Sequence, residues 1–352
     1  MWLNLAAKLS DFRAIFTSDC AKLHGKACYD AHHFVLDHCF LFLSIMTNQI
    51  TRRKRTLNGV LLLDKDSGMS SNSALQRARF LYGAAKAGHT GVLDPLATGL
   101  LPVCFGEATK FAQYLLDADK AYTATLRLGE ATTTGDAEGE KIASGTTDIT
   151  LRQVNEAIAF FSGQITQTPP MYSAIKHNGK PLYEYARAGI TIERRTRQVT
   201  IYQIEVIEFQ SPNLVLQVRC SKGTYIRTLA EDLAKYMGTV AHLTALRRTA
   251  TAGFQIEQTQ SLAAISSVDE QSRDEWLLPC DVLVQHFPAL TLSDQDILQL
   301  QHGINVQTNE KYGTMHPLRI YTTDRRFIGL VQYQPVTNSL KVLRLMSTAS
   351  AK

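Results

Sequence analysis

The stretch Gly88-His-Thr-Gly-Val-Leu-Asp-Pro-Leu-Ala-Thr-Gly-Leu-Leu-Pro102 is the most distinctive part of the chain. Its three glycines and two prolines stand among small residues, which is typical of a tight loop and not of a helix or strand interior. No Gly-Lys-Ser/Thr follows, so a Walker-type phosphate loop is excluded. We expect a rigid loop that holds one carboxylate, Asp94, beside Pro95. Taken alone, an Asp before a Pro is more often a turn-capping residue than a reactive one.

The segments around this stretch alternate between strand-like and helix-like patterns. Alternating or β-branched residues predict strands at Val60–Asp64, Tyr122–Leu128, Gln198–Phe209 and Leu214–Cys220. Helical periodicity and capping residues predict helices at Ala74–Leu81, Leu151–Phe161 and Thr228–Tyr236. Because these elements follow no regular βαβ order, we expect an α+β fold with a mixed, largely antiparallel central sheet flanked by helices.

A second domain is expected after a break near Leu277-Leu-Pro-Cys280 and Phe287-Pro288. Beyond this break, Leu292–Gly303 predicts a short helix that ends at glycine. Three short β-rich runs follow at Leu318–Thr322, Phe327–Gln334 and Leu340–Leu345. We therefore divide the chain into a large domain at 46–284, with an insertion at about 145–197, and a small β-rich domain at 285–352.

Residues 1–45 differ in composition from the rest of the chain, since they hold three of the six cysteines. Their longest apolar run, Cys39–Met46, is far shorter than the ~20 residues that span a bilayer, and no basic segment marks it as a secretory signal. Four potential metal ligands recur every fourth residue: Cys20, His24, Cys28 and His32. A helix would spread these four over ~18 Å, too far for one zinc ion. We expect Met46 to be the true start; the alternative is a functional extension.

The overall composition is that of an ordinary globular protein, with 45% hydrophobic and 20% charged residues. The chain has 37 Lys and Arg against 32 Asp and Glu, a net charge of +5 that permits a polyanionic partner without requiring one. The six cysteines form no CxxC pair and are too sparse for a disulfide framework. They indicate reduced thiols in a cytoplasmic protein.

The stretch around Asp94 resembles, almost letter for letter, the catalytic loop of the tRNA pseudouridine synthase B family. Other motifs agree with this family in order and spacing: Leu62–Lys65 with Gly68–Ser71, Lys120–Tyr122, Thr132–Gly139, Pro169–Lys176, Cys220–Thr228 and Ala241–Arg248. The resemblance covers about Asn58 to Arg248. It implies a pseudouridine synthase catalytic domain at 46–284, a thumb-like insertion at about 145–197, and a PUA-like RNA-binding domain at 285–352.

The resemblance implies that the protein isomerises uridine 55 in the T-loop of tRNA to pseudouridine. The reaction breaks the N1–C1′ bond, turns the uracil and rejoins it through C5, so neither a metal nor an organic cofactor is expected. A carboxylate must act beside the sugar and base, as in retaining glycosidases. Asp94 takes this role by its place in the motif. Three routes stay open: attack at C1′, attack at C6, or removal of the 2′ proton.

The motifs also imply partners for Asp94 within the site. A carboxylate that stays ionised in a dry pocket needs a fixed cation, and the motif makes Arg227 that cation. Tyr122 matches the tyrosine that stacks on the target base and moves its proton; a core tyrosine on an alternating strand is the alternative. Tyr225 and Leu246 match residues that line the uracil pocket.

RNA contacts are implied outside this pocket. A base has to leave its stack to be reached, and His89 matches the histidine that fills the gap; a general-base role is the alternative. Lys176 is expected to bind substrate. Phosphate contacts are expected from a pool of basic residues: Lys110, Lys176, Arg187, Arg194, Arg195, Arg197, Arg247 and Arg248.

Two positions depart from the family pattern. Asp66 stands where proline is usual, and Thr133 stands where Asp is common, although Asp136 keeps the next acidic position. The expected partner is tRNA, contacted at the T-loop and the acceptor arm, with no membrane, no obligate protein partner and a monomeric state. Two other functions are considered: a tRNA-folding chaperone without essential catalysis, and a related synthase that acts on ribosomal RNA.

Overall fold

A ten-stranded mixed sheet organises the larger part of the computed structural model, which describes residues 54–347. Its main path runs β14-β1-β3-β12-β4-β11-β10-β7, with β2 beside β3 and β13 beside β12. The strands are β1 (Gly59–Lys65), β2 (Ala87–His89), β3 (Thr98–Phe105), β4 (Lys120–Leu128), β7 (Gly163–Gln167), β10 (Arg197–Gln210), β11 (Asn213–Cys220), β12 (Ala241–Thr251), β13 (Phe254–Gln255) and β14 (Gln260–Ser261). Only the β1–β14 and β3–β12 pairings among these are parallel. The predicted mixed, largely antiparallel sheet is confirmed.

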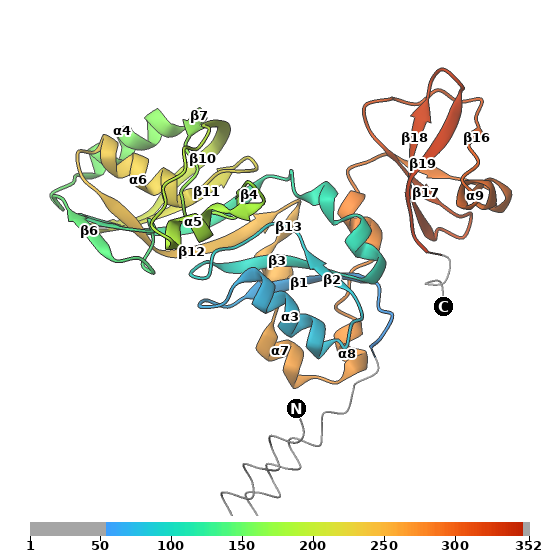
Figure 1. Cartoon of the computed structure of the whole chain (residues 1–352), viewed down its shortest axis with the longest axis horizontal. Helices are drawn as coiled ribbons and strands as arrows, with labels where there is room; N and C mark the ends of the chain where they lie inside the picture. Colours follow the sequence, from blue (N-terminus) through green and yellow to red (C-terminus); the bar gives the residue numbers. More distant parts are fainter. Residues whose placement is uncertain (1–53, 348–352) are drawn as a thin grey trace, which may run out of the picture. The chain divides into compact units, whose positions relative to one another are not determined.

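Helices cover the two halves of this sheet separately (Figure 1). α3 (Ser71–Leu81) and α7 (Leu262–Ser267) lie by β1 and β3, whereas α4 (Leu151–Phe161) and α6 (Ile226–Tyr236) lie by β4, β10 and β12. Side-chain caps begin two of these helices: Ser70 accepts from the Ser73 amide, and Thr150 forms a capping box with Gln153. The predicted helices are therefore present.

The stretch that was expected to be one loop is shorter than the sequence indicates. Its first residues belong to β2 and its last ones to β3, so the loop itself spans only 90–97. Gly99 has φ +99°, and a Cβ there would lie 2.4 Å from the Arg248 carbonyl oxygen, so glycine permits the close approach of β3 to β12. Pro102 lies where β3 changes its partner from β12 to β2, so its missing N–H leaves no gap in a continuous ladder.

The segment 145–197 is partly built into the main sheet. α4 contributes Val154 and Ala157 to the main core, and β7 pairs with β10 at the sheet edge. The remainder holds the hairpin β8 (Lys176–His177) and β9 (Lys180–Pro181), followed by α5 (Leu182–Arg187). A separate pair, β5 (Glu130–Thr132) and β6 (Lys141–Ser144), precedes the segment.

The C-terminal part forms a second sheet with its own core. This five-stranded sheet has the order β15-β17-β18-β19-β16. Its elements are β15 (Ala289–Thr291), α9 (Asp294–Gln301), β16 (Val306–Gln307), β17 (Leu318–Tyr321), β18 (Phe327–Gln334) and β19 (Ser339–Leu345). Ile320, Val331 and Leu340 are buried at its centre. The expected small β-rich, PUA-like domain is confirmed.

The remaining elements are short helical turns: η2 (Gly106–Lys110), η3 (Ala112–Leu115), η4 (Ile256–Gln258), α8 (Glu270–Asp274) and η5 (Cys280–Val284). Of these, α8 and η5 lie in the connection from β14 of the main sheet to β15 of the second sheet. No helix within 54–347 is long and apolar enough to cross a membrane. The expectation for residues 1–45 lies outside the described residues.

Candidate active site

A cavity of about 350 Å³ opens at the centre of the main sheet. Loop 90–97, β4, β12, the start of α6 and the segment after β7 all contribute to its lining. The five residues that the resemblance assigned to the pocket line it together: Asp94, Tyr122, Tyr225, Arg227 and Leu246. Two members of the basic pool, Arg197 and Arg248, line it as well. These residues come from distant parts of the chain, and the sheet brings them to one place.

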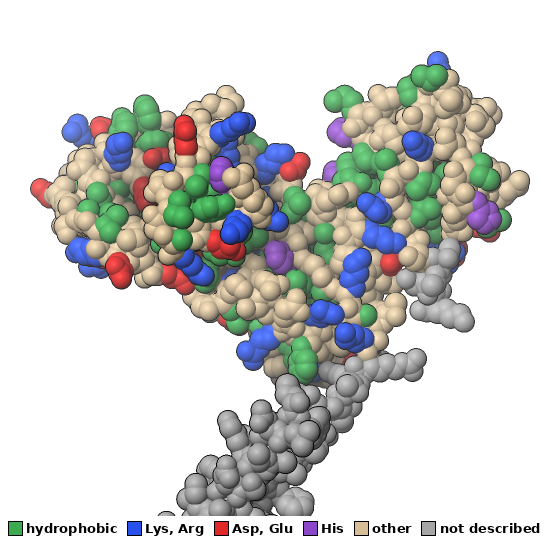
Figure 2. Space-filling model, in the orientation of Figure 1, with side chains coloured by type: hydrophobic (Ala, Val, Ile, Leu, Met, Phe, Trp, Pro, Cys, Tyr) green, Lys and Arg blue, Asp and Glu red, His purple; other side chains and the backbone are tan. Residues whose placement is uncertain are grey.

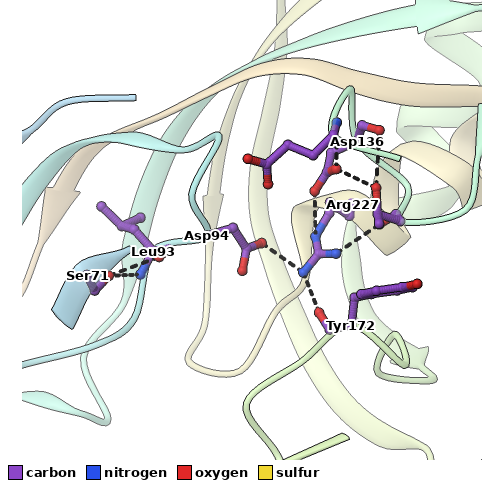
Figure 3. A network of polar contacts seen from close by, with 8 residues as sticks. Ser71, Leu93, Asp94, Asp136, Tyr172 and Arg227 are labelled. Carbon is purple, nitrogen blue, oxygen red and sulfur yellow. Dashed lines mark hydrogen bonds and ion pairs between the residues drawn. The ribbon is translucent and has the colours of Figure 1, made fainter. Parts of the chain in front are cut away.

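Loop 90–97 is held in place from both sides of Asp94. The buried Ser71 hydroxyl donates to the Leu93 carbonyl oxygen (2.9 Å) and accepts from the Leu93 amide (2.8 Å), as Figure 3 shows. On the other side, the Gly68 amide donates to the Pro95 carbonyl oxygen (2.9 Å), and Lys65 Nζ donates to the same oxygen (3.3 Å). Because these contacts constrain the backbone, the position of the Asp94 carboxylate is largely determined before any ligand binds.

Arg227, in the first turn of α6, connects Asp94 to three other groups (Figure 3). Its side chain is 5% exposed, and its Nη2 lies 2.8 Å from Asp94 Oδ2. Nη2 also donates to the Tyr172 carbonyl oxygen (2.7 Å), and Nη1 donates to the Thr134 carbonyl oxygen (2.8 Å). Nε faces Asp136 Oδ2 at 3.7 Å. One guanidinium is thus locked between two carboxylates and two carbonyl groups, which sets the direction of Asp94.

The electrostatics of the pair are a balance of opposing effects. Burial raises the pKa of Asp94 above its ordinary value, Arg227 opposes this rise, and the nearby Asp136 adds to it. Burial also lowers the pKa of Lys65 to about 8. Asp94 is therefore a carboxylate whose ionised form depends on its arginine partner, a pattern typical of functional sites.

The aromatic and apolar residues form the remaining walls. Tyr122 on β4 is 7% exposed, and burial raises the pKa of its hydroxyl. Tyr225 precedes α6 and stacks under the guanidinium of Arg197, 4.6 Å from the ring centre. Leu246 on β12 is 8% exposed. A flat, apolar ring system fits such a set of walls.

Two expected RNA-binding residues do not line the cavity. His89 lies on β2 and is half-buried, and burial together with Arg248 lowers its pKa. Its Nδ1 is buried without a hydrogen-bond partner among the described residues. Lys176 is exposed on the β8–β9 hairpin, next to the lining residues Ala174 and Ile175.

Lys110, Arg247 and Arg248 of the basic pool already contact other groups of the protein. Lys110 Nζ donates to Glu107 (2.7 Å) and to the Leu345 carbonyl oxygen (3.0 Å). Arg247 forms a two-pronged pair with Asp64, at 2.7 and 3.0 Å. Arg248 is 1% exposed and lines the cavity. These three side chains differ from Lys176, Arg187 and Arg195, which are exposed.

Sequence reasoning missed the position of Arg248 and the contact of Asp136 with Arg227. A signal for Arg248 was available, because it lies two residues after Leu246 on a strand, and such residues share a face. Asp136 gave no local signal, since its contact with Arg227 depends on the path of the chain after β5. Of the two departures from the family pattern, Asp66 is exposed, and the Thr133 hydroxyl accepts from the Glu140 amide (3.1 Å).

Within 54–347, no group of three or more His, Cys, Asp or Glu side chains is arranged to hold a metal ion. The polar groups of the cavity are instead suited to acid–base and nucleophilic chemistry at a carboxylate.

Two family models match adjoining parts of the chain. One describes the N-terminal domain of TruB family pseudouridylate synthases and matches residues 79–226, and the other describes the C-terminal domain of tRNA pseudouridylate synthase B and matches residues 227–285. Asp94 and Arg227 fall in the two successive matches.

Bacterial relatives match most of the chain. A Neisseria meningitidis serogroup B protein named tRNA pseudouridine synthase B is 61% identical over 299 residues, which are 85% of this chain and 97% of that protein. A Chromobacterium violaceum protein of the same name is 55% identical over 278 residues, 79% of this chain and 91% of that protein.

Solved structures are similar to the fold. The crystal structure of a Cbf5-Nop10-Gar1 complex matches with a TM-score of 0.63 and 25% identity, over 82% of this chain and 84% of that chain. The archaeal box H/ACA sRNP Nop10-Cbf5 complex matches in fold with a TM-score of 0.62 at 22% identity, over 84% of this chain and 89% of that chain. With the family models and relatives in agreement, the chain belongs to the TruB family of pseudouridylate synthases.

Proposed function

We propose that this protein converts uridine 55 in the T-loop of tRNA to pseudouridine, with Asp94 as the catalytic carboxylate. The observation that carries the proposal is the 2.8 Å ion pair between Asp94 and Arg227 in the wall of a cavity of about 350 Å³. A cavity of that size is typical of small-ligand sites and suits one nucleoside removed from its stack. The names of the bacterial relatives support tRNA as the substrate.

The residues around Asp94 fit the steps of this isomerisation. The N1–C1′ bond breaks, the uracil turns, and a C5–C1′ bond forms; C5 then loses a proton and N1 gains one, so no atom is consumed. Asp94 acts in its ionised form beside the sugar, at C1′, at C6 or on the 2′ proton. Arg227 orients it. Tyr122, Tyr225 and Leu246 hold the base between them, which keeps the uracil close while it turns.

The remaining contacts are assigned to the surface around the cavity. His89 fills the gap that the flipped base leaves, and Lys176 binds a phosphate near the T-loop. The thumb-like segment at about 145–197 of the catalytic domain (46–284) closes on the T-loop, and the PUA-like domain (285–352) contacts the acceptor arm. Figure 2 shows Lys and Arg side chains spread over this face of the described residues, which suits an RNA backbone. The protein acts as a cytoplasmic monomer.

The test is to incubate the purified protein with an unmodified tRNA transcript and an unmodified ribosomal RNA fragment, and to map pseudouridine in each. We expect modification of tRNA at position 55 alone. Asp94→Asn should bind tRNA with unchanged affinity and form no product, because the amide keeps the size of the carboxylate but loses its charge and basicity.

Asp66→Asn is the matched control, since Asp66 is an exposed carboxylate directly after β1 and outside the cavity lining. It should retain turnover. Product in ribosomal RNA alone would identify a different synthase, and tRNA folding without any product would identify a chaperone. Turnover by Asp94→Asn close to that of the unmodified protein would remove Asp94 from the mechanism.

A further inference from the structure

Arg248 is a buried cation without an acidic partner. Its side chain is among the largest fully buried ones, at 1% exposure, and within 54–347 no carboxylate lies at ion-pair distance from it. A buried charge without a counter-charge is costly, and proteins retain one chiefly where it serves another group. Burial lowers the pKa of Arg248, as expected for a desolvated cation.

The backbone of Arg248 is anchored on both sides. In the β12–β4 ladder it stands directly opposite Tyr122, and in the parallel β12–β3 pairing it stands beside Gly99. Directly opposite residues of neighbouring strands place their side chains on the same face of the sheet. Arg248 and Tyr122 therefore reach the cavity as a pair, and both line it.

The guanidinium is fixed in the same cavity wall as Tyr122. Nε of Arg248 donates to the Leu100 carbonyl oxygen (2.8 Å), which fixes the plane of the group. Its positive charge lowers the pKa of the Tyr122 hydroxyl, which belongs to the residue directly opposite in the ladder. Nη2 is buried and has no partner among the described residues, so donor capacity is left over on the side chain.

Among the groups that shift the pKa of Tyr122, Arg248 is the one whose charge favours the ionised phenol. Around Arg248 stand further basic groups, namely Lys120 on β4, His89 on β2 and Lys65 on β1, and its charge lowers the pKa of each. Burial, Cys220 on β11 and Asp94 raise the pKa of the Tyr122 hydroxyl, whereas the charge of Arg248 lowers it. The positive charge of Arg248 thus opposes burial, Asp94 and Cys220 at the phenol.

We infer that Arg248 is a positioning residue that holds the Tyr122 hydroxyl and stabilises its phenolate, which takes the C5 proton of the rejoined base. The inference rests on the proposed function and assigns to Arg248 a part in its last step, the removal of the proton from C5. The electron pair of the C5–H bond forms the C5=C6 double bond, and the proton passes to the Tyr122 oxygen. The C6=N1 double bond opens at the same time, its electron pair moves to N1, and N1 takes up a proton from solvent. The step needs no oxidant, reductant or further reactant.

The test compares tRNA carrying deuterium or hydrogen at C5 of the target uridine, in single-turnover reactions across pH. Arg248→Met should slow product formation by about 10²-fold, the usual loss when acid–base catalysis fails. Removal of C5–H should then limit the rate, so a deuterium isotope effect larger than that of the unmodified protein should appear. The alkaline rise in rate should move upward by about 1–3 pH units, because a neighbouring cation has been removed.

Arg247→Met is the matched control on the same strand. Arg247 pairs with Asp64 and does not line the cavity, so its loss should leave the isotope effect and the midpoint of the pH profile unchanged. Arg248→Lys keeps a positive charge and should recover part of the rate with a smaller pH shift. This variant also keeps the inference testable if Arg248→Met fails to fold.

A double-variant experiment separates action through Tyr122 from a merely structural role. In a Tyr122→Phe background, Arg248→Lys should change the rate less than about twofold, because the group through which Arg248 acts is gone. Multiplicative losses, or an Arg248→Met protein that is folded and slow with an unchanged isotope effect and pH profile, would overturn the inference. Failure of the proposed function looks different, since the unmodified protein would then form no pseudouridine in tRNA.

Discussion

Arg227 contacts Asp94 and Asp136 at once, so its variants can separate charge from geometry. Arg227→Met should raise the pKa of Asp94 further above its ordinary value, because burial and Asp136 then act unopposed by this cation. Turnover that needs an ionised Asp94 should be lost at low pH and return in part as pH rises. Leaving Asp136 buried and unpaired should also lower the free energy of unfolding by about 3–5 kcal/mol. Single-turnover rates across pH and urea unfolding measure both effects.

Arg227→Lys is the companion variant, because it keeps the charge and loses the planar, two-pronged contact. Its pH shift and its loss of stability should both be smaller, and tRNA affinity should change little in either variant. A different result would contradict the pairing: weaker tRNA binding with a shallower salt dependence in both variants, and full turnover at saturating tRNA. Arg227 would then be a phosphate contact.

The parallel pairing of β3 with β12 places the Arg248 backbone directly beside Gly99, and the missing side chain of Gly99 permits this close approach. In Gly99→Ala, the added methyl group would meet the Arg248 backbone at 2.4 Å and the residue would keep a φ near +99°. We expect a loss of about 1–3 kcal/mol in the free energy of unfolding from backbone strain alone. Turnover should fall as well, because the strands must separate and carry Arg248 with them.

Gly88→Ala on β2 is the control variant. A Cβ added at Gly88 would lie 3.7 Å from the Thr109 methyl carbon, which is an ordinary van der Waals contact. Urea unfolding should find this variant close to the unmodified protein. Equal stability of the two variants would contradict the importance of the close β3–β12 approach.

Within 54–347, the cores contain three buried free thiols, Cys104, Cys220 and Cys280, and from these we predict a loss of stability at alkaline pH. Burial raises the pKa of Cys104 and Cys280 to about 12 and that of Cys220 to about 11. Above the ordinary thiol pKa of about 8.5 the unfolded chain releases these protons and the folded protein keeps them. The folded state therefore loses about 1.4 kcal/mol per thiol for each pH unit, until the folded values are reached.

Lys65 acts in the opposite direction, because its pKa of about 8 in the folded protein lies below its unfolded value, so its contribution to stability rises with pH. Burial also lowers the pKa of Lys120, which acts in the same direction as Lys65. Two lysines against three thiols still leave a net loss of stability, to be measured by urea unfolding at neutral pH and at about pH 10, under reducing conditions. The double variant Cys104→Ala/Cys280→Ala should show a shallower decline. Stability that does not fall with pH would rule out this linkage.

Local patterns accounted for most elements of the protein. Strands at Tyr122–Leu128 and Leu214–Cys220 and the helix at Leu151–Phe161 were predicted within a few residues, because side-chain periodicity and capping act over neighbouring positions. The same local reasoning was wrong at both ends of the stretch around Asp94. Glycine and proline usually interrupt strands, but here both residues lie within β3. Gly99 permits the close approach of β3 to β12, and Pro102 lies where β3 changes its partner from β12 to β2, which only the assembled sheet reveals.

The sequence by itself determined the chemistry available and the family, since the motifs around Asp94, Tyr122 and Arg227 are contiguous. Tertiary structure alone decided that Asp136 faces the far side of Arg227 and that Arg248 is a buried cation opposite Tyr122 in the cavity wall. The physical reason is that charge and side-chain type belong to the residue. Burial and partners depend on which strands become neighbours, and long-range pairing sets that order.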